Sequence, residues 1–202
     1  MGITPQQFKE IQARLATGRQ AAQPLMPATF DVCKQRQSVV LGIDPSLRGT
    51  GYGLIRLVRP FPETLAFGTI VCKANWPHSR CLVHIVQNLR QLLQQHQPSL
   101  CVVEGLFYAQ NLQTAQIMGE ARGAALATVA EAGLEIYELA PRKVKQAIVG
   151  YGAAQKIAVA KMVQRMLRLT ETPPPDAADA LALALAHAQS NGRYTFNTPK
   201  RI

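Results

Sequence analysis

The chain has 202 residues, and its 22 lysines and arginines against 12 aspartates and glutamates give a formal net charge of +10. Hydrophobic residues make up 48% and charged residues 17%, which excludes wholesale disorder and allows a buried core. No stretch approaches the roughly 18 uninterrupted apolar residues of a membrane span, and the N-terminus lacks the apolar run of a secretory signal.

The cysteines and the net charge indicate a compartment and a class of partner. The four cysteines show neither Cys-x-x-Cys spacing nor a histidine at zinc-finger spacing, so we expect buried, reduced thiols and a cytoplasmic protein. A net charge of +10 favours a polyanionic partner. Nucleic acid is the natural candidate, because no amphipathic membrane anchor is evident.

Three regions are expected along the chain. Residues 1–36 are predicted to be an N-terminal extension, partly helical near its start and followed by a proline-rich linker. Residues 37–190 carry the alternating apolar segments of one folded domain, and residues 191–202 form a basic tail.

The folded domain is predicted to begin with three strands. Residues 39–44, Val-Val-Leu-Gly-Ile-Asp, are a short apolar run that ends in a carboxylate and is typical of a buried strand. Residues 52–58 and 64–71 are the next two strands, and the links between the strands are short and contain glycine or proline. Short links favour antiparallel neighbours, so we expect a three-stranded antiparallel meander.

Helices and strands alternate in the rest of the domain. The expected elements are a helix over 79–96, a strand over 100–104, a helix over 111–132 and a strand over 134–139. Three more helices are expected to begin at Pro141, Ala154 and Asp176. The order predicts an α/β fold with a mixed five-stranded sheet, a meander plus two parallel strands, flanked by helices.

Four carboxylates occupy informative positions. Asp44 and Glu104 each end a predicted strand, and Asp176 and Asp179 share one face of the last helix. Taken singly, a strand-end or helix-start carboxylate is explained by a turn or a cap. Asp179 is harder to explain in this way, because it lies in an almost wholly apolar helix with no lysine or arginine one turn away.

We expect the first and fourth strands to be neighbours in the mixed sheet, which would bring Asp44 and Glu104 together, with the last helix carrying Asp176 and Asp179 to the same point. Carboxylates that meet in this way need positive charge. Two carboxylates about 4 Å apart repel by roughly 4 kcal/mol at an effective dielectric constant near 20. Two Mg²⁺ ions would balance the four negative charges, and hard oxygen ligands suit Mg²⁺, for which Mn²⁺ can substitute. Two ions about 4 Å apart clamp the attacking and leaving oxygens of a phosphodiester. The pattern therefore favours metal-dependent phosphodiester hydrolysis.

Several short motifs follow one another between Val39 and His187. They include Gly42-Ile-Asp44-Pro, Glu104-Gly-Leu-Phe107-Tyr, Gly119-Glu-Ala-Arg122-Gly, Arg142-Lys-Val-Lys145-Gln and Asp176-Ala-Ala-Asp179. In this order and at these spacings, they closely resemble the RuvC family of bacterial Holliday-junction resolvases, the crossover junction endodeoxyribonucleases. The resemblance covers about three-quarters of the chain.

The resemblance implies a ribonuclease-H-like fold, a homodimer and Mg²⁺-dependent paired symmetric nicking of four-way DNA junctions in recombination and repair, with 5′-phosphate products. It marks as metal-binding catalytic residues Asp44, Glu104, Asp176 and Asp179. It also implies a branch-migration complex of the RuvA and RuvB type as a partner. The chain departs from the family where Ser46-Leu47 replaces the usual glycine after Asp-Pro, and residues 1–36 have no counterpart.

A one-sign charge run and an aromatic pair are candidate DNA contacts. Seven basic residues and no acid lie between Leu139 and Leu169, which favours phosphate contact over an ordinary solvated face. From this run we expect DNA contacts by Arg142 and Lys143. The resemblance implies such contacts for Lys145 and Lys156, and a lysine at position 145 could also stabilise charge that develops in the transition state. Phe107 and Tyr108 are either core residues or, by the resemblance, part of a loop in which Phe107 stacks on junction bases.

Other interpretations stay open at this point. The small residues of 111–132 suit packing on the sheet or, by the resemblance, a two-fold interface that gives each scissile phosphate its own active site. The main alternative function is a ribonuclease-H-like RNA-processing nuclease of the pre-ribosomal type. A sugar-kinase-like nucleotide-binding protein would need a second lobe, and a non-cutting junction-binding protein would not need four acids.

Overall fold

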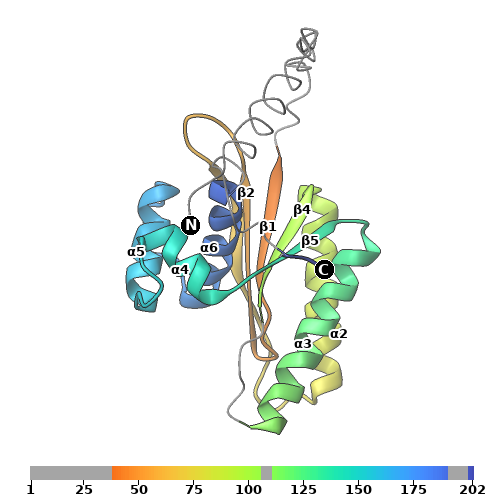
Figure 1. Cartoon of the computed structure of the whole chain (residues 1–202). Helices are drawn as coiled ribbons and strands as arrows, with labels where there is room; N and C mark the ends of the chain where they lie inside the picture. The colour runs from red at the N-terminus through yellow and green to blue at the C-terminus, as the bar shows by residue number, and fades with distance from the viewer. Residues whose placement is uncertain (1–37, 106–110, 191–199) are drawn as a thin grey trace, which may run out of the picture. The chain divides into compact units, whose positions relative to one another are not determined.

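A six-stranded mixed sheet with helices on both faces forms the fold in the computed structural model, which describes residues 38–105, 111–190 and 200–202 (Figure 1). The strands are β1 (Val39–Asp44), β2 (Gly49–Arg56), β3 (Glu63–Val71), β4 (Leu100–Glu104), β5 (Glu135–Leu139) and β6 (Lys200–Arg201). The helices are α2 (His78–His96), α3 (Leu112–Glu131), α4 (Pro141–Val149), α5 (Lys156–Met166) and α6 (Pro175–Ser190). Among these, none is long and apolar enough to cross a membrane.

The sheet has the strand order β3-β2-β1-β4-β5-β6. The first three strands pair antiparallel, which confirms the predicted meander. β4 pairs parallel with β1 and with β5, as predicted for the two later strands. The prediction of five strands was one short, because Lys200 and Arg201 of the basic tail pair antiparallel with Glu138 and Tyr137. Two basic residues carry no alternation of apolar and polar positions that would reveal a strand.

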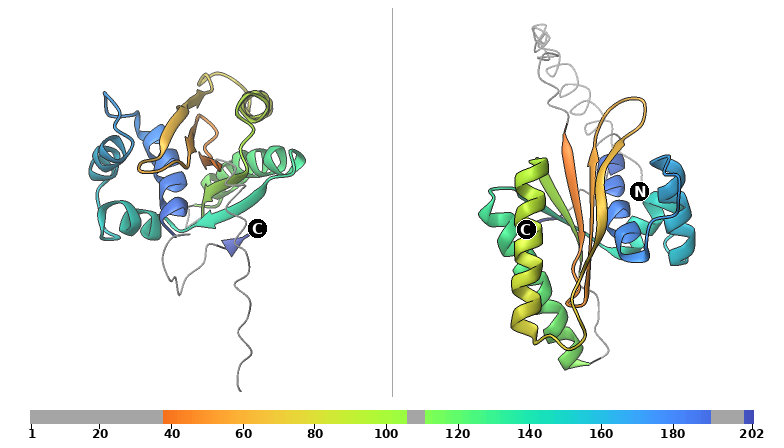
Figure 2. Two further views of the ribbon diagram at one scale, coloured as in Figure 1. Left: turned by 90° about the horizontal axis from the view of Figure 1, so that it is seen from above. Right: turned by 180° about the vertical axis from the view of Figure 1, so that it is seen from behind.

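Each face of the sheet has its own hydrophobic core, because successive side chains of a strand point to opposite faces. Val40 of β1 and Val102 of β4 pack with α4, α5 and α6. Leu41 and Ile43 of β1 pack with α2 and α3 on the other face. Figure 2 shows these two helical layers on either side of the sheet. Both faces of the central strands are therefore buried, which accounts for their continuous apolar runs.

Glycines on β1 and β2 let α6 lie directly on the sheet backbone. Gly42 and Gly53 are opposite each other in the β1–β2 pair, and Gly51 is opposite Asp44. A Cβ on Gly42 would overlap the Ala180 carbonyl oxygen, and one on Gly51 would overlap the Asp176 carbonyl oxygen. The absence of side chains at these glycines is thus what permits so close an approach of helix and sheet.

We predict that Gly42→Ala destabilises the protein, because the added methyl group must push α6 away from β1. The expected loss is roughly 1–3 kcal/mol of unfolding free energy, measured by urea denaturation. Gly123→Ala is the matched control, since nothing lies within 4 Å of a Cβ at this position of α3. The control is expected to be neutral or to gain about 0.5–1 kcal/mol of helix propensity. Equal unfolding midpoints for Gly42→Ala and wild type would contradict the close packing.

Candidate active site

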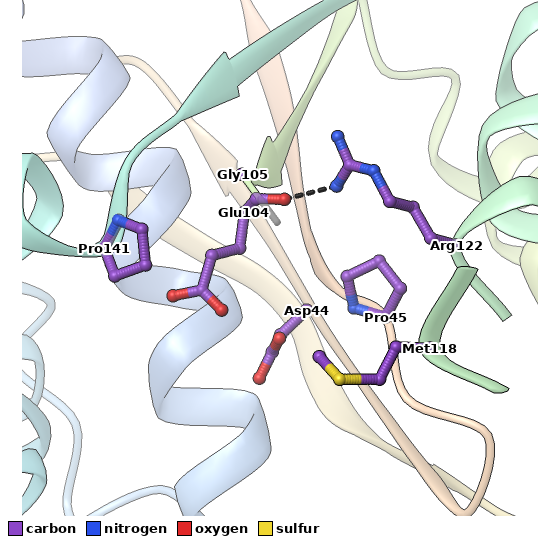
Figure 3. A pocket seen from close by; sticks show the side chains of 7 residues that line it. All are labelled: Asp44, Pro45, Glu104, Gly105, Met118, Arg122 and Pro141. Atoms are coloured by element: carbon purple, nitrogen blue, oxygen red, sulfur yellow. Dashed lines mark hydrogen bonds between the residues drawn. The ribbon is translucent and has the colours of Figure 1, made fainter. Parts of the chain in front are cut away.

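Asp44 and Glu104 lie together because of the sheet topology. Each is the last residue of its strand, and β1 and β4 are parallel neighbours, so both end at the same edge of the sheet. Asp44 follows Val40, and Glu104 follows Val102, at even spacing, which directs both side chains toward the α6 face. Figure 3 shows both carboxylates at one pocket. Its lining residues are Asp44, Pro45, Glu104, Gly105, Met118, Arg122 and Pro141.

The seating of α6 brings the other two carboxylates to the same edge. The main chain of Asp176 lies over Gly51, which is the cross-strand partner of Asp44. Asp179 follows on the same helix face, one turn further along α6. The structure therefore brings together all four carboxylates that the sequence singled out, and their charges act on one another.

The pKa of Asp44 reflects its burial and the neighbouring carboxylates. Burial raises the pKa of Asp44 from 3.8 to about 6, and the carboxylates of Asp179 and Asp176 contribute to the rise. The ammonium group of Lys156 opposes it. An aspartate at this position is thus partly protonated near neutral pH unless further positive charge is supplied.

Glu104 is perturbed in the same direction. Burial raises the pKa of Glu104 from 4.5 to about 7, and the charges of Asp44 and Asp179 add to the effect. Lys156 and Lys145 lower the pKa of Glu104, so both lysines act on the carboxylate cluster. A strong upward shift caused by burial and like charge in a cleft is typical of functional sites.

Lysines from the α4–α5 region supply the positive charge at the cluster. The Nζ of Lys156, at the start of α5, donates a hydrogen bond of 2.8 Å to the Asp179 carboxylate. This bond and the charge of Asp179 raise the pKa of Lys156, and Asp44 and Glu104 add to the rise. Arg142 and Lys143 lie exposed in the first turn of α4. Phe107 and Tyr108 lie outside the described residues.

The donor set has the chemistry of a Mg²⁺ site. Carboxylate oxygens are the hard ligands that Mg²⁺ prefers. A divalent cation would favour the ionised forms of Asp44 and Glu104, whose pKa values are raised by burial and, in addition, by neighbouring carboxylates. As the side chains stand, no three His, Cys, Asp or Glu residues in the described ranges are arranged to hold a metal ion. The Asp179 carboxylate contacts Lys156 instead.

Sequence reasoning quoted the motif around Arg122 but assigned that residue no role. The Arg122 side chain lines the pocket and bonds to the main-chain carbonyl of Glu104 and to Glu138 of β5. A lone arginine in an otherwise alanine-rich helix was the available signal, because a charge on such a helix needs a buried partner or an exposed face. The partner itself, Glu138, belongs to a different element and could not be identified from spacing.

The family model and the sequence relatives of this chain carry the same name. The family model for crossover junction endodeoxyribonuclease RuvC matches residues 40–187. The RuvC of Syntrophomonas wolfei is 45% identical over 152 residues, which are 75% of this chain and 88% of that protein. The RuvC of Akkermansia muciniphila is 44% identical over 148 residues, 73% of this chain and 89% of that protein.

Solved structures agree with the sequence relatives. The structure of T. thermophilus RuvC in complex with Holliday junction substrate aligns with a TM-score of 0.75 and 33% identity, covering 82% of this chain and 99% of that one. The yeast mitochondrial Holliday junction resolvase Ydc2, at 13% identity and a TM-score of 0.52 over 74% of this chain and 78% of that one, shares the fold. The predicted ribonuclease-H-like fold is confirmed, and this chain belongs to the RuvC family of crossover junction endodeoxyribonucleases.

Proposed function

We propose that this protein is a structure-selective endonuclease that resolves four-way DNA junctions by paired, symmetric nicks. The observation that carries the proposal is the convergence of Asp44, Glu104, Asp176 and Asp179 at one sheet edge, in a chain of the RuvC family. The products would be 5′-phosphate and 3′-hydroxyl ends that a ligase can seal. The RNA-processing alternative is not favoured, because the relatives are named for cutting DNA crossover junctions.

In the proposed mechanism, the four carboxylates would hold the divalent cations, two Mg²⁺ ions per active site. When bound, Mg²⁺ supplies activation of the attacking water and stabilisation of the leaving oxygen. The chain's own residues position the phosphate. Lys145 and Lys156 lie where their charges act on the carboxylate cluster, and each can stabilise negative charge that develops on a phosphate there.

The wider DNA contact follows from the distribution of charge. Arg142 and Lys143 are exposed at the start of α4, next to the pocket residue Pro141. We propose that they bind the phosphates of one junction arm, and that Phe107 and Tyr108 stack on bases at the crossover. Phosphate contacts orient the protein, whereas stacking on unpaired bases selects an opened junction.

A four-way junction carries two symmetric scissile phosphates, so a two-fold dimer would present one active site to each. We propose a homodimer for this reason, with the exposed Gly123 side of α3 as the candidate interface. A branch-migration complex of the RuvA and RuvB type, acting in the cytoplasm, is the proposed partner. These assignments rest on the family and on the symmetry of the substrate.

The central experiment incubates a synthetic four-way junction with the protein and Mg²⁺. We expect symmetric nicks in two opposed strands by the wild type, and binding without cutting by Asp179→Asn, because a neutral amide oxygen binds Mg²⁺ more weakly than a carboxylate oxygen. Glu131→Gln is the matched control, since Glu131 lies exposed at the end of α3. Structured RNA incubated in parallel tests the alternative, and cleavage of RNA alone would contradict the proposal.

The cleavage rate is expected to depend on pH in a direction set by the two raised pKa values. Protons compete with the metal for Asp44 (pKa about 6) and Glu104 (pKa about 7), so the rate at limiting Mg²⁺ should fall as the pH falls. If both groups must be ionised, the drop from pH 7 to pH 6 is about tenfold. Higher Mg²⁺ should move the midpoint to lower pH. If the pH midpoint of the single-turnover cleavage rate does not change with the Mg²⁺ concentration, this competition is refuted.

The stacking role of Phe107 predicts a selective defect. Phe107→Ala should slow junction cleavage and leave the thermal unfolding midpoint unchanged, because it removes about 1–3 kcal/mol of base stacking and no core packing. Phe61→Ala is the control, an exposed phenylalanine outside the carboxylate pocket. If Phe107→Ala unfolded at a lower temperature and cut the junction at the wild-type rate, Phe107 would be a core residue.

A further inference from the structure

Arg122 contacts two neighbouring strands, β4 and β5, at the edge of the sheet where the carboxylates lie. It lies on α3, in the helical layer opposite α6, and its side chain is only 9% exposed. One guanidinium nitrogen, Nη1, donates to the main-chain carbonyl oxygen of Glu104, as drawn in Figure 3. The other, Nη2, lies 2.5 Å from the carboxylate of Glu138 on β5. A single side chain thus contacts the adjacent ends of β4 and β5.

The contacted carbonyl belongs to the last residue of β4. Beyond Glu104, the strand pairing ends with the bond from the Gly105 amide to the Leu139 carbonyl oxygen, at 2.8 Å. The Glu104 side chain points to the α6 face, while Arg122 holds its carbonyl from the α3 layer. A hydrogen bond to the carbonyl restrains the peptide plane, and with it the direction in which the carboxylate leaves the strand.

The ion pair with Glu138 explains how a charged arginine side chain can be buried next to the end of β4. Glu138 is opposite Val103 in the β4–β5 pair, one residue before Glu104. Its carboxylate neutralises the guanidinium group of Arg122 and, by binding Nη2, fixes the direction of the planar group. Nη1 then points to the Glu104 carbonyl oxygen. A lysine has a single ammonium on a flexible stem and does not reproduce a fork of fixed geometry.

We infer that Arg122, oriented by Glu138, is a positioning residue that holds the end of β4 so that the Glu104 carboxylate stays at the metal-binding cluster. The inference rests on the proposed function of that cluster. Arg122 acts through Glu104, because its Nη1 and Nη2 are engaged by the Glu104 carbonyl oxygen and the Glu138 carboxylate. The competing interpretation is that the ion pair only fastens α3 to the sheet, in which case its loss would lower stability and nothing else.

The test compares wild type with Arg122→Met and with the double variant Arg122→Met/Glu138→Met. The single variant leaves Glu138 without its partner and should lower the unfolding midpoint, whereas the double variant removes both charges and should recover it. Arg90→Met is the matched control, because Arg90 of α2 pairs with Glu131 of α3, the helix that also carries Arg122, at 2.8 Å. Both of these side chains are more than half exposed, at 53% and 63%. The readouts are thermal unfolding, single-turnover junction cleavage and Mn²⁺ binding to the free protein by electron paramagnetic resonance.

A positioning role predicts that both Arg122 variants cut the junction about 10²-fold more slowly than wild type. They should also bind Mn²⁺ more weakly, at temperatures well below their unfolding midpoints, while Arg90→Met matches wild type in both respects. If the double variant recovers its unfolding midpoint and also cleaves and binds Mn²⁺ like wild type, the positioning role is refuted. Failure of the wild-type protein itself to nick the junction would refute the proposed function instead.

Discussion

The close approach of α6 to the sheet is the constraint on which the candidate site depends. Gly42, Gly51 and Gly53 leave the surface of β1 and β2 without side chains where the helix crosses them. A helix resting on Cβ atoms would stand further from the sheet and would carry Asp176 and Asp179 away from Asp44. The glycines therefore do more than permit turns, because they set the distance between the carboxylates of one layer and the carboxylates of another.

Burying these carboxylates next to one another costs free energy. Burial is the main cause of the raised pKa values of Asp44 and Glu104, and the neighbouring negative charges add to it. The chain offsets part of this cost with lysines rather than by spacing the acids apart. Lys156 is largely exposed, so it can contact Asp179 and still be accessible to a phosphate. A protein with a net charge of +10 thus combines a cluster of carboxylates at one sheet edge with a surface that attracts polyanions such as DNA.

The sequence predicted what periodicity and strand ends can encode, namely the meander, the parallel neighbours β1 and β4, and the meeting of Asp44 with Glu104. It placed the start of the second strand at residue 52, whereas β2 begins at Gly49, because glycines in a strand resemble a turn until the helix that packs on them is known. The strand β6 was missed, since its two residues belong to a sheet edge and carry no pattern of their own. Pairs between different elements, such as Arg122 of α3 with Glu138 of β5, cannot be predicted from the spacing of residues in the sequence.

The two helical layers act on the carboxylates in different ways. On one face, α6 carries Asp176 and Asp179 itself, so their positions follow the packing of helix backbone on strand backbone. On the other face, Arg122 of α3 donates one hydrogen bond to the Glu104 carbonyl oxygen of β4 and one to the Glu138 carboxylate of β5. The α6 layer therefore fixes two carboxylates by carrying them, whereas the α3 layer acts on Glu104 from behind the sheet, through Arg122.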